Sequence, residues 1–206
     1  MKRNLHFCFL LCAAYGGLQS ELIATDRYVS PVGAHLAPFT DWATAATNIQ
    51  AAIDASAAGD KVWVTNGLYD TGGRIVAGGS LSNRVALTTI VTVQSVNGPE
   101  ATIIAGARTP ATTNGPASAR CAWLTNGATL SGFTLTNGAT LAVASDFNGG
   151  GAYCRGVSAT LTNCIIGGNS AAGGGGGVYQ GTVRGCVILS NTAAQGGGAY
   201  NAWLSG

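Results

Sequence analysis

A glycine-rich fragment occurs three times in the second half of this chain and limits the folds that it can adopt. It reads GGGAY at 149–153, GGGVY at 175–179 and GGGAY at 196–200. Two longer segments lie between the copies and align with each other, TNCIIGGNSA at 162–171 and RGCVILSNTA at 184–193. The aligned segments begin 22 residues apart. Repeats of about this length are typical of solenoids, in which each unit stacks on the previous one because no unit can bury its apolar face alone.

Each repeat predicts strands rather than a helix. In the unit at 160–179, short apolar segments alternate with glycine and asparagine. Glycine costs about 1 kcal/mol per residue in a helix interior, which excludes a helix in so glycine-rich a region. We expect each strand to pair in parallel with the equivalent strand one coil away, about 4.8 Å along the stack. The predicted fold is therefore all-β, a parallel β-helix solenoid over residues 60–206.

The aligned repeats place Cys164 over Cys186 and Asn169 over Asn191, each pair 22 residues apart. We expect the cysteines to form an inward-facing ladder and the asparagine side chains to form a hydrogen-bonded one. The alternative for the asparagines is that they are turn residues that tolerate a left-handed backbone. For the cysteines, a disulfide remains open beside free thiols, because adjacent coils bring stacked Cα atoms within disulfide range.

These units resemble the coils of right-handed parallel β-helix proteins with the pectin-lyase-like fold. The segment 48–70 combines a helical pattern, Gly-Asp, an apolar strand and Gly-x-Tyr, and is similar to the opening segment of many of these proteins. The alternation of Ile-x-x-Asn at 166–169 with GGGAY also resembles the repeats of polymorphic outer membrane proteins, which have Phe in place of Ile. The resemblance implies a right-handed β-helix, and many proteins of this fold cleave or modify acidic polysaccharides.

The first residues have the pattern of a secretory signal peptide. Lys2 and Arg3 precede an apolar run at 5–15, which is too short for a transmembrane helix. We expect a signal peptide at 1–20, then a strand, a loop and a capping helix at 21–59, and no transmembrane helix in the mature chain. The expected location is secreted, periplasmic or at the cell surface.

One amphipathic helix is predicted from Asp41 to Ala58, with Asp41 as the N-cap and Gly59 at the C′ position. An open stack of strands needs its end covered, so we expect this helix to cap the N-terminal end. The sequence stops at Gly206 without a closing helix. We therefore expect a truncated C-terminus and self-association through an uncapped last coil.

A β-sandwich is the alternative fold. Thr-Asn-Gly occurs at 65–67, 125–127 and 136–138, and Asn-Gly between strands favours antiparallel hairpins. The fixed spacing of the repeat favours the solenoid instead. Two stretches, roughly 107–119 and 139–148, interrupt the period, and we expect them to project as loops, where function commonly lies.

The composition excludes several functions. Charged residues make up 9% of the chain, compared with about 25% in an ordinary soluble domain. Without the leader that holds Lys2 and Arg3, eight basic residues balance eight acidic ones, so no basic field for nucleic acid exists. We find no metal-ligand spacing of Cys or His and no glycine-rich nucleotide motif, and expect neither a metal ion nor a cofactor.

The sequence predicts no catalytic residues. Glycoside hydrolysis needs two carboxylates about 5–10 Å apart. After residue 71 the only carboxylates are Glu100, in an Asn-Gly-Pro-Glu turn, and Asp146, in an irregular loop, and both are kept as candidate loop residues. We expect a structural, adhesive or carbohydrate-contacting role, with a polysaccharide or cell-surface glycan as partner. The alternative is the N-terminal part of a polysaccharide lyase or hydrolase whose active site lies beyond Gly206.

Overall fold

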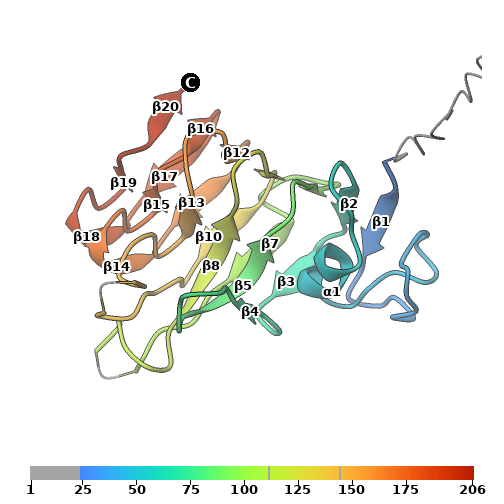
Figure 1. The fold of residues 1–206 in the computed structure, drawn as a ribbon, viewed down its shortest axis with the longest axis horizontal. Helices are drawn as coiled ribbons and strands as arrows, with labels where there is room; N and C mark the ends of the chain where they lie inside the picture. The colour runs from blue at the N-terminus through green and yellow to red at the C-terminus, as the bar shows by residue number, and fades with distance from the viewer. Residues whose placement is uncertain (1–23, 111, 144) are drawn as a thin grey trace, which may run out of the picture.

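Three β-sheets run side by side along the molecule in the computed structural model, and successive coils of the chain add one strand to each (Figure 1). The structure describes residues 24–110, 112–143 and 145–206. The predicted signal peptide lies outside these residues.

Each sheet is built from strands that are distant in sequence. The first sheet has the order β1 (Asp26–Val29), β2 (Lys61–Val64), β6 (Thr92–Ser95), β9 (Thr129–Ser131), β12 (Thr160–Thr162), β16 (Thr182–Arg184), β20 (Trp203–Ser205). The second has the order β3 (Gly67–Tyr69), β7 (Thr102–Ala105), β10 (Thr134–Thr136), β13 (Ile165–Gly167), β17 (Val187–Leu189). The third has the order β4 (Arg74–Ile75), β5 (Ser82–Leu87), β8 (Ala119–Leu124), β11 (Ala152–Cys154), β15 (Val178–Tyr179), β19 (Ala199–Tyr200). A short fourth sheet pairs β14 (Ser170–Gly174) with β18 (Thr192–Gln195).

Parallel pairing distinguishes the solenoid from the β-sandwich. Among the named strands of the described residues, only β4 and β5 pair antiparallel. At each Thr-Asn-Gly segment the chain leaves one sheet for another instead of forming a hairpin. The sandwich alternative is therefore wrong, and the prediction of stacked parallel strands, compatible with a β-helix solenoid, is confirmed.

Alternating side chains explain how the sheets enclose a core. In strands such as β9, β12 and β16, the middle residue is buried and its two neighbours face outward. The parallel register stacks these middle residues into continuous columns. One column comprises Val62, Val93, Leu130, Leu161 and Val183, and another Tyr69, Ile104, Leu135 and Ile166.

The helix is much shorter than predicted. Within the predicted range only α1 (Ile49–Asp54) is an α-helix, and its N-cap is Asn48, whose Oδ1 accepts a hydrogen bond from Ala51 N at 2.9 Å. Asp41 instead accepts a bond from Thr44 N at 2.7 Å within a turn. The predicted helix boundaries and the predicted N-cap are therefore wrong.

Backbone pairing with β1 explains the difference. Ala46 N donates to Tyr28 O, and Ser30 N donates to Ala46 O, both at 2.9 Å. These bonds hold Ala46 beside Val29 in an isolated parallel bridge. The same backbone groups cannot also form the ladder of a helix that begins at Asp41. The remaining helix packs on β1, β2 and β5.

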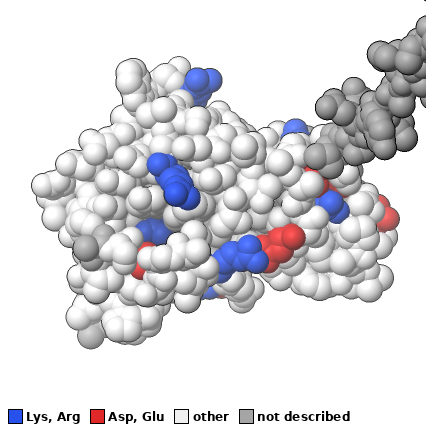
Figure 2. Space-filling model, viewed as in Figure 1, with Lys and Arg blue, Asp and Glu red and all other residues white. Residues whose placement is uncertain are grey.

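Charged side chains are sparse on the face shown in Figure 2, where some blue groups stand alone in uncharged surface and others lie beside red groups. None of the helices within the described residues has the length and apolar character needed to cross a membrane.

Candidate binding site

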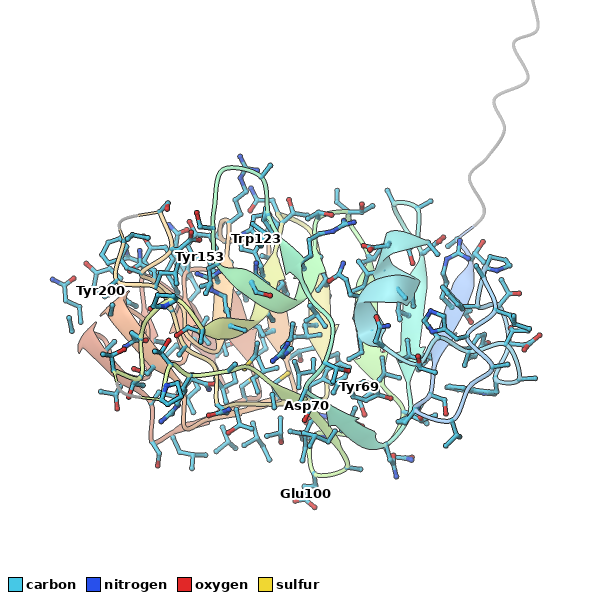
Figure 3. All side chains as sticks on the ribbon, turned by 90° about the horizontal axis from the view of Figure 1, so that it is seen from below. Tyr69, Asp70, Glu100, Trp123, Tyr153 and Tyr200 are labelled. Carbon is cyan, nitrogen blue, oxygen red and sulfur yellow. The ribbon has the colours of Figure 1, made fainter. Side chains whose placement is uncertain are left out.

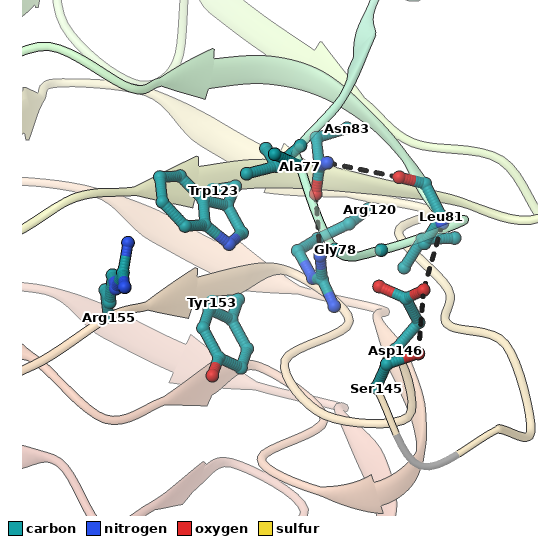
Figure 4. Close-up of a pocket in the computed structure, with 12 residues that line it drawn as sticks. Ala77, Gly78, Leu81, Asn83, Arg120, Trp123, Ser145, Asp146, Tyr153 and Arg155 are labelled. Atoms are coloured by element: carbon teal, nitrogen blue, oxygen red, sulfur yellow. Dashed lines mark hydrogen bonds between the residues drawn. The ribbon is translucent and has the colours of Figure 1, made fainter.

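A cavity of about 210 Å³ lies on the outward face of the third sheet, where three segments distant in sequence meet (Figure 4). The turn at 76–79 between β4 and β5 forms one wall. Ser145 and Asp146, from the loop that precedes β11, form another. The strands β8 and β11 contribute Arg120, Trp123 and Tyr153. Sites for drug-sized ligands have volumes of about 300–1,000 Å³, so this cavity suits a smaller ligand or one unit of a longer one.

Arg120 supplies a buried positive charge to the cavity. The residue is only 2% exposed, and its guanidinium donates to Gly149 O at 2.7 Å, Asn83 Oδ1 at 2.6 Å and Asn148 O at 2.8 Å. The parallel register that pairs Asn83 with Arg120 brings these two side chains together. Burial lowers the pKa of Arg120 to about 10, and the Asp146 carboxylate opposes this shift. The group therefore stays charged at neutral pH.

Asp146 supplies a carboxylate of which only one oxygen accepts hydrogen bonds from described residues. The residue is 6% exposed, and its Oδ2 accepts bonds from Ser80 N at 2.6 Å, Leu81 N at 3.2 Å and Ser145 Oγ at 3.3 Å. No hydrogen bond from any described residue reaches Oδ1. Figure 4 shows this second oxygen facing the Arg120 guanidinium across the cavity.

Glycine at position 79 is required for this arrangement. A Cβ atom built on Gly79 would lie 2.9 Å from Asp146 Oδ1. The missing side chain therefore lets the turn between β4 and β5 approach the carboxylate. No ion pair within 4.0 Å joins Asp146 to Arg120 in the described part of the chain. The space between them is open to a ligand.

A column of stacked aromatic rings starts at the cavity. Trp123, Tyr153, Tyr179 and Tyr200 lie in register on β8, β11, β15 and β19. Successive ring centroids are 6.4, 5.1 and 6.0 Å apart, with interplanar angles of 6°, 18° and 17°. Figure 3 shows Trp123, Tyr153 and Tyr200 along one side of the molecule. Stacked rings cover each other's faces, so this column mainly presents ring edges and tyrosine hydroxyls to solvent.

The Trp123 end of the column is different. The equivalent position on β5 is Ala86, which carries only a methyl group. The face of Trp123 that points away from Tyr153 is therefore not stacked on another ring. The Arg120 guanidinium carbon lies 5.2 Å from the centroid of the Tyr153 ring, a cation–π distance.

A second cavity lies next along the column. It has a volume of about 420 Å³ and is lined by Tyr179 and Tyr200 together with the polar side chains of Asn148 and Gln195. Because Tyr153 stacks on Tyr179, the two cavities occupy neighbouring stretches of one surface.

The structure separates the two carboxylates that the sequence singled out. Asp146 lines the first cavity, whereas Glu100 is exposed in a turn on the opposite side of the molecule from Trp123 and Tyr153 (Figure 3). The two therefore cannot act together on one bond.

The two pairs of aligned residues lie at the corners between sheets. Asn169 Nδ2 donates to Asn191 Oδ1 at 3.0 Å and to Leu135 O at 2.9 Å, and Asn169 Oδ1 accepts from Gly138 N at 2.8 Å. Cys164 is buried and Cys186 is half-buried in the next coil. Neither pair lines the first cavity.

Sequence reasoning missed Arg120, Trp123, Tyr153 and Asn83. The tyrosine of the repeated GGGAY fragment indicated a repeat, but its spacing does not show that Trp123 continues the same column. A basic residue three positions before a strand aromatic, as Arg120 is before Trp123, is a weak signal on its own. Its importance depends on the loop that brings Asp146 to the cavity.

No group of three or more His, Cys, Asp or Glu side chains that could hold a metal ion occurs within the residues that the structure describes. Comparisons with protein-family models, with curated proteins and with solved structures found no match to this chain.

Proposed function

We propose that this chain is a secreted or cell-surface β-helix of the right-handed, pectin-lyase-like type, which serves as a scaffold that contacts carbohydrate. The leader pattern at 1–20 supports export. The helix α1 packs on β1, the first strand of the first sheet, and in this proposal it covers the N-terminal end of the stack.

The observation that carries the proposal is the position of Asp146 Oδ1 opposite the Arg120 guanidinium in a cavity lined by Trp123 and Tyr153. Arg120 has five N–H donors, and three of its nitrogens already donate to the protein. A sugar hydroxyl both donates and accepts hydrogen bonds. Adjacent hydroxyls of one ring can therefore donate to the carboxylate and accept from the guanidinium, and both bonds are charge-assisted.

The aromatic residues suit the apolar part of the same ligand. A sugar ring has C–H groups on its faces, and the unstacked face of Trp123 offers a partner for them. The exposed wall of this cavity is more polar than apolar, which suits a ligand rich in hydroxyl groups. The single carboxylate favours binding over hydrolysis, because no second carboxylate of the described residues lines this cavity.

A glycan array followed by calorimetry on the best ligand tests the proposal. Asp146→Asn keeps an acceptor for Ser80 and Leu81 but removes the charge, and we expect it to weaken binding about 10- to 100-fold, the value of a charge-assisted hydrogen bond. Trp123→Ala should weaken binding to a similar extent. Glu100→Gln is the matched control, because this carboxylate is exposed on the other side, and it should bind like the unmodified protein.

The circular dichroism spectra of all variants should match that of the unmodified protein. The proposal fails if no glycan binds, or if a glycan binds equally well to Asp146→Asn and Trp123→Ala.

A further inference from the structure

Two cysteines in neighbouring coils lie directly beside each other. Cys164 and Cys186 immediately precede β13 and β17, which pair in parallel with Ile165 opposite Val187. Phe133 holds the same position before β10. Aligned residues on paired strands are about 4.8 Å apart, which is within the Cα separation of about 4.4–6.8 Å that a disulfide spans.

One hydrogen bond places the Cys186 sulfur next to Cys164. Cys164 N donates to Cys186 Sγ at 3.3 Å, so the second sulfur lies against the backbone of the first residue. The competing bonds of the thiols are weak, from Cys164 Sγ to Thr162 O at 3.2 Å and from Cys186 Sγ to Arg184 O at 3.3 Å. Rotation of the two thiols toward each other would therefore break only these weak hydrogen bonds.

The pKa values of the described cysteines differ. The hydrogen bond with Cys186, together with burial, raises the pKa of Cys164 well above its ordinary value. Cys121 and Cys154 are fully buried, and burial raises the pKa of each thiol to about 12. Cys186 is half-buried. Its interaction with the Cys164 thiol, and the bond from Cys164 N, lower the pKa of Cys186 to about 7 even though burial opposes this shift. A thiolate at Cys186 is thus accessible at neutral pH, and thiolates are the attacking species in disulfide exchange.

We propose that Cys164 and Cys186 form a disulfide bond between neighbouring coils when the protein meets a small-molecule disulfide such as oxidised glutathione. The Cys186 thiolate attacks one sulfur of glutathione disulfide, forms a mixed disulfide and releases one glutathione thiolate. Cys164 then attacks Cys186 Sγ and passes its proton to the second glutathione sulfur, which leaves as glutathione. Two protein thiols are oxidised and one glutathione disulfide is reduced to two glutathione molecules. The bond closes a loop of about 22 residues and cross-links one coil to the next.

The sequence makes this bond easy to detect. Trypsin cleaves after Arg155 and Arg184, so Cys164 and Cys186 fall in separate peptides, 156–184 and 185–206. The full chain is incubated with oxidised glutathione, alkylated under denaturing conditions and digested without reductant. We expect one species with the summed mass of the two peptides less two hydrogens. The peptide 121–155, which contains Cys121 and Cys154, should carry two alkyl groups.

Variants provide the controls. Cys186→Ser should abolish the linked species, whereas Cys154→Ser should leave it unchanged. Oxidation should raise the midpoint of thermal unfolding by about 5–10 °C in the unmodified protein and in Cys154→Ser, but not in Cys186→Ser. Recovery of Cys164 and Cys186 as separate alkylated peptides, or of Cys186 as a stable glutathione adduct beside a free Cys164, would overturn the proposal.

Discussion

Buried charges in this protein are each held by several hydrogen bonds from distant segments. Asp60 is 2% exposed. Its Oδ1 accepts from Thr25 N at 2.8 Å, and its Oδ2 accepts from Ala57 N at 2.9 Å and Arg27 Nη2 at 3.1 Å. The carboxylate therefore ties β1 to the segment that leads into β2. Replacement of the Asp60 carboxylate would leave the Arg27 guanidinium and the backbone N–H groups that donate to it without this acceptor.

Asp60 gives the first prediction, a pH-dependent loss of stability. Burial alone would raise the pKa of Asp60, but bonds from Thr25 and Ala57 and the charge of Arg27 together lower it below 3.8. A depressed folded-state pKa contributes stability above the unfolded-state pKa, and this contribution is lost as the pH falls through the folded-state value. We expect Asp60→Asn to lower the free energy of unfolding by about 2–4 kcal/mol at pH 7, and by progressively less as the pH falls below 3.8 toward the folded-state pKa.

Urea titrations at pH 7 and pH 3, followed by tryptophan fluorescence, measure this difference. Asp26→Asn, on the exposed side of β1, is the matched control and should have little effect. An equal loss for Asp60→Asn at both pH values would contradict the prediction.

At the scale of single elements, sequence pattern and tertiary pairing compete for the same backbone groups. The apolar spacing from Trp42 to Ala57 is helical, yet the chain becomes helical only at Ile49. The segment before it bonds to β1 through Ala46. In α1 itself Ile49, Ala52 and Ile53 are buried, so the helical face that the spacing indicated is used over its last part only.

The second prediction follows from the observed N-cap. Asn48→Ala removes the acceptor for Ala51 N, and we expect it to lower the free energy of unfolding by about 1 kcal/mol. Asp41→Ala should have a smaller effect, because Asp41 is exposed and caps a turn rather than the helix. Urea denaturation of both variants checks this order. A larger loss of stability for Asp41→Ala would instead support the longer helix, beginning at Asp41, that the sequence suggested.

At the scale of the whole molecule, each coil contacts mainly the coils on either side of it. Stability in such a stack depends on nearest neighbours, so local opening varies along the stack. The strand β12 lies between β9 and β16, and its Leu161 is fully buried. The strand β20 pairs only with β16 among the described strands, and all three of its residues are exposed.

Hydrogen exchange gives the third prediction. We expect the amides of β12 to exchange at least about tenfold more slowly than those of β20 at neutral pH, because they open only when two coil contacts are lost. Exchange measured by mass spectrometry on overlapping peptides resolves both strands. Equal rates in β12 and β20 would show that the stack opens as one unit.

The sequence by itself determined the architecture of the stack. A repeat that fixes residue type at a regular spacing can bury its apolar residues only when equivalent strands lie side by side, and the register of Leu161 with Val183, 22 residues apart, follows from that condition. Glycine-rich turns also excluded helices over this region. These features depend on local chemistry repeated along the chain, which a sequence displays directly.

Only the tertiary structure decided the position of the candidate site and the length of the helix. Asp146 lies in a loop without periodicity, and its place is fixed by bonds to Ser80 and Leu81, 66 and 65 residues away in sequence. Arg120 is buried because Asn83 and the carbonyl groups of Asn148 and Gly149 surround it. Helix α1 begins late because β1 engages Ala46. In each case a bond between distant segments outweighs the local preference of a few residues, and no local pattern in the sequence encodes such a bond.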